Sequence, residues 1–180
     1  MTNEIIMSGF GGQGIMLMGQ LITYAGMLEN KNVSWIPSYG PEMRGGTAYC
    51  SIIISDEPVG APVVTEPTIV VAMNLPSLDK FEASLRPGGT LIINSSLIER
   101  SSNRSDIKVY KVPANDIATE LGNNKVTNMV VLGAIIRATN TVDANSVLKA
   151  FSKMFAKKPS LLAINEKALK RGAEYIAELS

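Results

Sequence analysis

The sequence contains no histidine and only one cysteine, Cys50, among its 180 residues. A serine–histidine–aspartate hydrolase and a histidine-ligated zinc or haem site are therefore excluded. A single cysteine also excludes an internal disulfide, a CxxC redox pair and an iron–sulfur cluster held by this chain alone. This cysteine usage is typical of reducing conditions, and we expect a cytoplasmic location.

Charge and long apolar runs are scarce as well. Charged residues make up 18% of the chain, and 17 basic against 16 acidic residues leave a net charge of +1. This balance gives no electrostatic reason to expect nucleic acid or an anionic membrane as the main partner. No apolar stretch reaches the roughly 18 residues that span a bilayer, and the start of the chain lacks the pattern of a signal peptide. Hydrophobic residues at 46% predict a folded chain.

Short apolar runs alternate with helical patterns through the first two thirds of the chain. The first strand, a glycine-rich turn, a long helix and a second strand form one βαβ unit, which favours a parallel sheet. We predict a single domain over residues 1–180, a three-layer Rossmann-like α/β fold with a mainly parallel sheet. The predicted strands are 4–8, 32–37, 47–56, 69–73, 90–94 and 107–113, and the predicted helices are 14–29, 76–85, 115–121 and most of the chain after 125.

The helix predicted at 14–29 is apolar on most of its sides. Such a helix must be covered on most of its faces, either by the rest of this chain or by a partner subunit. If a partner covers it, the isolated chain exposes an apolar patch larger than the few hundred Å² usual for monomers. We therefore expect the isolated chain to self-associate or to belong to an oligomer.

The glycine-rich turn is the first candidate site. Gly9, Gly11 and Gly14 fit the pattern G-x-G-x-x-G, and Gly12 adds a fourth glycine between a strand and a helix. Backbone amides in such a turn can cradle a phosphate, although a tight turn for close packing has the same sequence. A dinucleotide site usually has an acidic residue at the end of the second strand, and residues 34–37 (SWIP) contain none. The pattern thus favours a phosphate-cradling turn or an inherited backbone shape over an autonomous NAD or FAD site.

The second candidate site is the loop that follows the second strand. It contains Tyr39, Glu42, Arg44, Gly45 and Gly46. Arg44 offers a planar fork to a carboxylate, a phosphate or a partner's backbone. A surface turn with a weak Glu–Arg ion pair explains the same residues equally well.

Cys50 lies in a strand-like run, and the typical role of such a cysteine is that of a small buried apolar residue. No histidine and no adjacent lysine is present to lower its pKa. General acid–base chemistry would depend on carboxylates, lysines or tyrosines, and no pair of these stands out. The chain by itself does not contain a complete active site.

The run GFGGQGI followed by SYGPEMRGGTAYCSIIISD resembles the γ subunit of 2-oxoacid:ferredoxin oxidoreductases. The resemblance covers nearly the whole chain and implies the fold of the γ domain of pyruvate:ferredoxin oxidoreductase. The loop sequence GPEMRGGTA is more similar to that of the 2-oxoglutarate branch of this family than to that of the pyruvate and ketoisovalerate branch.

This resemblance implies an enzyme subunit that is inactive alone. The complex would convert a 2-oxoacid to acyl-CoA and CO2 and pass electrons to ferredoxin. It would use thiamine diphosphate, Mg, iron–sulfur clusters and coenzyme A, and we expect no cofactor to be held by this chain alone. The expected partners are α and β subunits, with a δ subunit as a further candidate. The glycine turn would then cradle a phosphate, and Tyr39, Glu42 and Arg44 would face a partner or coenzyme A, because both loops are expected at the carboxyl ends of neighbouring parallel strands.

Overall fold

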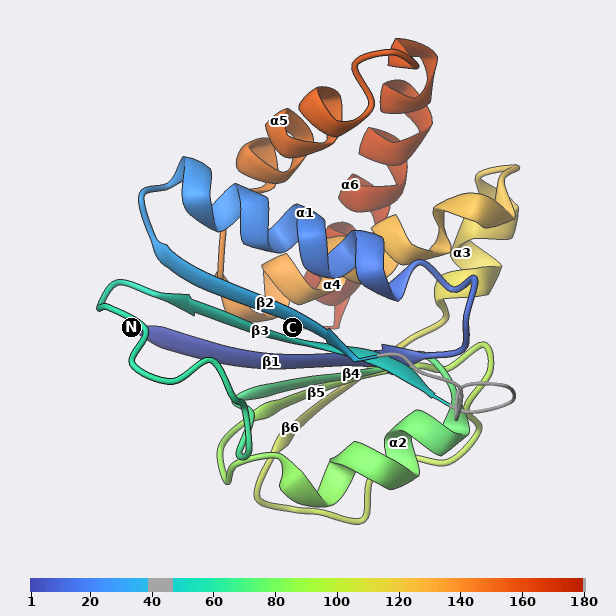
Figure 1. The fold of residues 1–180 in the computed structure, drawn as a ribbon. Helices are drawn as coiled ribbons and strands as arrows, with labels where there is room; N and C mark the ends of the chain where they lie inside the picture. The colour runs from blue at the N-terminus through green and yellow to red at the C-terminus, as the bar shows by residue number, and fades with distance from the viewer. Residues whose placement is uncertain (39–46, 180) are drawn as a thin grey trace.

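The computed structural model describes residues 1–38 and 47–179, which fold around a six-stranded sheet (Figure 1). The strand order is β2-β3-β1-β4-β5-β6. The strands are β1 (Thr2–Gly9), β2 (Asn32–Ser38), β3 (Ala48–Ser55), β4 (Ile69–Ala72), β5 (Thr90–Asn94) and β6 (Lys108–Val112). The helices are α1 (Ile15–Leu28), α2 (Leu75–Phe81), α3 (Ala114–Glu120), α4 (Thr127–Thr139), α5 (Ala144–Met154) and α6 (Leu162–Glu178). Every predicted strand and helix is present.

Five strands of this sheet run in one direction and β3 runs in the other. β1, β4, β5 and β6 pair in parallel, whereas β3 pairs antiparallel with both β1 and β2. The prediction of a mainly parallel α/β fold is therefore confirmed. The expectation that the first two strands are neighbours is wrong, because β3 lies between them. The connection from β2 to β3 is too short for a parallel crossover, so the chain reverses and pairs antiparallel.

Helices cover both faces of the sheet and produce the predicted three layers (Figure 1). On one face, Ile5, Met7 and Ile92 pack with residues of α1, α3 and α4. On the other face, Ile6 and Ile93 belong to a smaller cluster that includes residues of α2. Since both faces are buried, β1, β4 and β5 carry continuous apolar runs instead of alternating patterns.

Helix α1 is covered largely by its own chain. It packs on the strands β2 and β3 and also against α4 and α5. Residues on several of its sides are fully buried, among them Met18, Leu21 and Ile22. The predicted need for cover beyond the sheet is therefore met mainly inside the chain, although Met27 remains 54% exposed.

Helices α4 and α6 approach each other at two glycines. A Cβ atom added to Gly133 would overlap the carbonyl oxygen of Leu169, and one added to Gly172 would overlap the carbonyl oxygen of Val130. Only glycine permits this backbone approach. The crossing buries α4 from Thr127 to Ile136 and fixes the position of its first turn.

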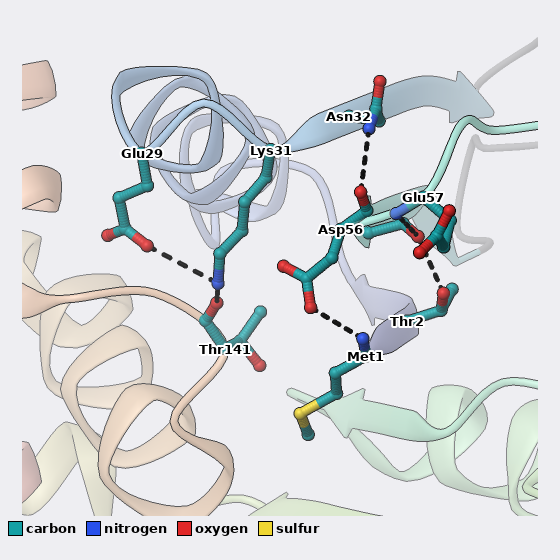
Figure 2. A network of polar contacts seen from close by, with 9 residues as sticks. Met1, Thr2, Glu29, Lys31, Asn32, Asp56, Glu57 and Thr141 are labelled. Carbon is teal, nitrogen blue, oxygen red and sulfur yellow. Dashed lines mark hydrogen bonds and ion pairs between the residues drawn. The ribbon is translucent and has the colours of Figure 1, made fainter.

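Polar contacts tie the turn after α1 to the segment between α4 and α5 (Figure 2). Lys31 Nζ donates to the carbonyl oxygen of Thr141 at 2.7 Å and lies 3.5 Å from a carboxylate oxygen of Glu29. The other oxygen of Glu29 accepts from the amide of Asp143 at 2.7 Å. These contacts hold the outer helices against the sheet layer.

Side chains contact the starts of α5 and α3 in different ways. Asp143 Oδ1 accepts from the amide of Asn145 at 2.7 Å, so Asp143 caps α5. α3 has no side-chain cap from the residue that precedes it, and the amide of Asp116 donates instead to Ser96 Oγ, which belongs to another segment, at 3.2 Å. Among the helices of the described ranges, none is both long enough and apolar enough to cross a bilayer.

Candidate functional site

The glycine turn joins the end of β1 to the start of α1 at the carboxyl edge of the parallel strands (Figure 1). Gly12 and Gly14 have φ angles of 88° and 76°. Residues with a Cβ rarely adopt these angles, so the turn requires glycine at both positions. A Cβ added to Gly11 would meet no atom within 4 Å, which leaves the outer side of the turn open.

Gly9 serves close packing. A Cβ added there would lie 2.5 Å from Gln13 Oε1 and 2.9 Å from Met73 Cβ. The glycine at this position therefore lets the Gln13 side chain fold back over the end of β1. Of the two roles considered for a glycine-rich turn, packing accounts for Gly9, while Gly11 and Gly12 leave room for a ligand.

A cavity of about 150 Å³ opens beside the turn at this edge. Its walls come from segments that are distant in the sequence: the glycine turn, the residue after β4, the start of α3 and the start of α4. The lining residues are Gly12, Gln13, Gly14, Met73, Asn115, Asn124, Lys125, Thr127 and Asn128. Ligands of open α/β sheets bind outside the carboxyl ends of the strands, which is where this cavity lies.

The residue that precedes α1, Gly14, and the first turn of α4 both line this cavity. The residues that precede the two helices, Gly14 and Val126, make no capping hydrogen bond, and neither first turn contains an acidic residue. Amides in a first turn lack helical partners and carry partial positive charge. Lys125 is the only charged residue among the described residues that line the cavity. The local field therefore favours an anion.

Asn128 adds a hydrogen-bond donor to the cavity wall. This residue is only 7% exposed, and its Oδ1 accepts from the amide of Met129 at 3.0 Å. Its Nδ2 lies against Gly14, and the residue lines the cavity. A ligand oxygen at this point would accept a hydrogen bond from Nδ2.

Sequence reasoning missed Lys125 and Asn128, as well as Asn115. The polar run NNKVTN (residues 123–128) directly before an apolar helix is the one local signal for them. Nothing in that run indicates that it lies opposite the glycine turn, because this depends on the order of β1, β4, β5 and β6 in the sheet.

The second predicted site lies outside the described residues. Its residues are Tyr39, Glu42, Arg44, Gly45 and Gly46. On either side of this segment, Ser38 at the end of β2 pairs with Tyr49, and Ala48 at the start of β3 pairs with Gly9. These pairings bring the end of β2 and the start of β3 to the same sheet edge as the glycine turn.

Cys50 is fully buried in β3, as predicted. Burial raises the pKa of its thiol to about 12, and the adjacent Trp35 side chain acts in the opposite direction. A thiol in this state is a poor nucleophile and a poor metal ligand. Across the described ranges, no group of three or more cysteine, aspartate or glutamate residues is placed to hold a metal ion.

These features define an α/β domain whose carboxyl edge presents a glycine turn, a lysine and side-chain amides to one cavity. The chain belongs to the pyruvate ferredoxin/flavodoxin oxidoreductase family, whose model matches residues 4–175. This match confirms the resemblance found in the sequence.

Relatives in this family are named as oxidoreductase subunits. Ketoisovalerate oxidoreductase subunit VorA of Methanothermobacter marburgensis is 38% identical over 96% of this chain, and the chain spans only about a third of that relative, 36%. 2-Oxoglutarate synthase subunit KorC of Methanocaldococcus jannaschii is 39% identical over 83% of this chain and 82% of the relative. Because the two substrate names occur at nearly equal identity, the preference for 2-oxoglutarate stays a prediction.

Solved structures have the same fold. The γ subunit of a keto/oxoacid ferredoxin oxidoreductase from Geobacter sulfurreducens matches with a TM-score of 0.84 and 29% identity, over 98% of this chain and 99% of that chain. The 2-oxoglutarate:ferredoxin oxidoreductase from Magnetococcus marinus gives a TM-score of 0.91 at 24% identity, over 99% of this chain and 32% of that chain. The second likeness concerns the fold alone.

Proposed function

We propose that this chain is the γ component of a thiamine-diphosphate-dependent 2-oxoacid:ferredoxin oxidoreductase, where it contributes a phosphate-binding wall to the coenzyme A site. The complex would convert a 2-oxoacid and coenzyme A to acyl-CoA and CO2, and two electrons would pass to ferredoxin. The loop sequence GPEMRGGTA and the relative named 2-oxoglutarate synthase support 2-oxoglutarate as the oxoacid.

The cavity beside the glycine turn carries this proposal. It combines the glycine turn, the Lys125 side chain and the side-chain amide of Asn128. At about 150 Å³ it is smaller than the roughly 300–1,000 Å³ of pockets that enclose a whole small-molecule ligand. It is suited to one phosphate group, and the remainder of coenzyme A would extend toward a partner subunit.

The other cofactors are proposed to lie on partner chains. Thiamine diphosphate, Mg and the iron–sulfur clusters would supply decarboxylation and electron transfer from the α and β subunits, with a δ subunit as a further candidate. The burial of Cys50 and the raised pKa of its thiol support this division, because they make this cysteine a poor metal ligand. Tyr39, Glu42 and Arg44 would contact a partner or coenzyme A.

A freestanding NAD-binding oxidoreductase is less well supported. The acidic residue of a dinucleotide site lies at the end of the parallel strand beside β1. On one side β1 pairs with β3, which runs in the opposite direction and places Ala48 beside Gly9. On the other side it pairs in parallel with β4, which ends at Ala72. Among the described residues, neither strand therefore places a carboxylate for a ribose at this position.

The test compares variants in the complex purified with its native partners. Lys125→Ala and Asn128→Ala should each raise the KM for coenzyme A about tenfold with little change in kcat, since each removes binding shared by ground and transition states. Lys149→Ala, on the exposed side of α5, is the matched control. Unchanged KM values in both cavity variants would leave this chain a scaffold without a ligand of its own. Turnover of an oxoacid by the isolated chain would contradict the subunit role.

A further inference from the structure

The Gln13 side chain makes three hydrogen bonds at the glycine turn. Its Oε1 accepts from the amide of Phe10 at 2.6 Å and from Asn74 Nδ2 at 3.3 Å. Its Nε2 donates to the carbonyl oxygen of Met73 at 3.3 Å. One side chain thus closes the turn after β1 and joins it to the residues that follow β4.

Asn74 continues this connection into the protein interior. Its Oδ1 accepts from both the amide and the hydroxyl of Ser77, at 2.9 and 2.7 Å. Ser8 Oγ lies 2.9 Å from Ser77 Oγ, and Asn74, Ser77 and Ser8 are all nearly fully buried. The contacts of Gln13 are therefore anchored to a rigid part of the fold.

A second branch leads from Met73 toward the far wall of the cavity. The Met73 carbonyl oxygen also lies 3.4 Å from Asn94 Nδ2, which donates to Asn115 Oδ1 at 2.8 Å. Both Met73 and Asn115 line the cavity. The amides of Gln13, Asn94 and Asn115 thereby link the glycine turn, the end of β5 and the start of α3.

The geometry explains why position 9 is glycine and position 13 carries an amide. A Cβ at Gly9 would occupy the space of Gln13 Oε1. A glutamate at position 13 could still accept from Phe10, but its second oxygen would face the Met73 carbonyl oxygen and place negative charge at the cavity. Glutamine supplies the acceptor and the donor without charge.

A turn this rich in glycine needs such a contact. Glycine loses more backbone freedom on ordering than any other residue, and added Cβ atoms at Gly11 and Gly12 would meet no neighbour. Order that is absent before binding has to be acquired when the ligand arrives, which lowers affinity.

We infer that Gln13 is the positioning residue of the proposed phosphate site, holding the glycine turn in its binding geometry through Asn74 and Met73. The identity of the ligand in this inference rests on the proposed function. The ordering of the glycine turn by Gln13 does not depend on it. Two measurements therefore apply to the complex purified with its partners: amide hydrogen exchange of residues 10–14, and steady-state kinetics with coenzyme A.

Gln13→Ala should speed amide exchange at Gly11 and Gly12 and raise the KM for coenzyme A about tenfold, with kcat nearly unchanged. Gln13→Glu keeps an acceptor for Phe10, so it should retain slower exchange than Gln13→Ala and still raise the KM. Gln20→Ala, two turns along α1, is the control and should match wild type in both measurements. If Gln13→Ala does not assemble, the Gln13→Glu comparison decides.

Wild-type exchange rates in Gln13→Ala would overturn the positioning role, and so would a wild-type KM despite faster exchange. If Lys125→Ala and Asn128→Ala both leave the KM unchanged, the proposed phosphate site fails, and the exchange rates still decide whether Gln13 orders the turn. A KM raised by Lys125→Ala but not by Gln13→Ala would reject the inference and keep the proposed function.

Discussion

Replacement of Gly172 by alanine tests the crossing of α4 and α6, which sets the position of Asn128. The added Cβ would overlap the carbonyl oxygen of Val130 and would lie 2.7 Å from its carbonyl carbon. These are backbone atoms of a buried helix, so the conflict is relieved only if α4 and α6 move apart.

The expected loss of stability combines two opposing effects. Overpacking of this kind costs about 1–3 kcal/mol, and a backbone obstacle places Gly172→Ala at the upper end. Alanine recovers about 1 kcal/mol through its higher helix propensity. We expect a net loss of about 2 kcal/mol, which lowers Tm by roughly 4–8 °C in a domain of this size.

Denaturant unfolding followed by circular dichroism measures this loss as a lower midpoint with an unchanged m value. Gly26→Ala is the matched control, since its Cβ would meet only side-chain atoms, Val33 Cγ1 at 3.0 Å and Ile54 Cγ2 at 3.3 Å. We expect Gly26→Ala to remain near wild-type stability because small side-chain shifts and the gain in propensity offset each other. If Gly172→Ala proves as stable as Gly26→Ala, the proposed close backbone approach is incorrect.

Three further outcomes are expected. Cys50 should resist thiol reagents at pH 8 until the protein unfolds, because burial raises the pKa of its thiol from 9.0 to about 12. Between about pH 9 and pH 12 the thiol ionises in the unfolded chain but not in the folded one, which favours unfolding. The free energy of unfolding should therefore decline over this range by more in the wild type than in Cys50→Ala. Asp143→Ala should lower the free energy of unfolding by about 0.5–2 kcal/mol through loss of the α5 cap, whereas Asp143→Ser should retain most of it; equal losses in chemical denaturation would reject the capping role. The isolated chain should self-associate in analytical ultracentrifugation through the surface that contains Met27, Trp35 and Met154, and Met27→Lys should reduce the association; a monomer at high concentration would refute this.

The boundaries of the elements could be predicted from sequence because glycine, proline and apolar runs are local signals. The strand predicted at 90–94 and the helix predicted at 14–29 match β5 and α1 within a residue. The insertion of β3 between β1 and β2 was missed because strand pairing depends on contacts between distant residues. The contact of Ser96 with the amide of Asp116 in α3 is invisible in sequence for the same reason, since Ser96 belongs to another segment.

The residues of the candidate site likewise divide into those with a local sequence signal and those that depend on contacts between distant segments. Gly12 and Gly14 could be found because positive φ angles select glycine locally. Lys125 and Asn128 could not, since they reach the glycine turn only once α4 has packed across the sheet. The contacts of Gln13 are also invisible in sequence, because they depend on how β4 lies beside β1.

The lining of the cavity also has a consequence for how a bound ligand could be identified. Among the described lining residues there is no carboxylate, and the chain has no histidine. A terminal phosphate gains its second negative charge near pH 6, whereas the inner diphosphate linkage of a nucleotide keeps a constant charge through that range. A ligand affinity that decreases as the pH falls below about 6 would thus identify a terminal phosphate in the cavity, and an affinity independent of pH would identify the diphosphate. The pH dependence of binding therefore reports the ionisation of the ligand and not that of the protein.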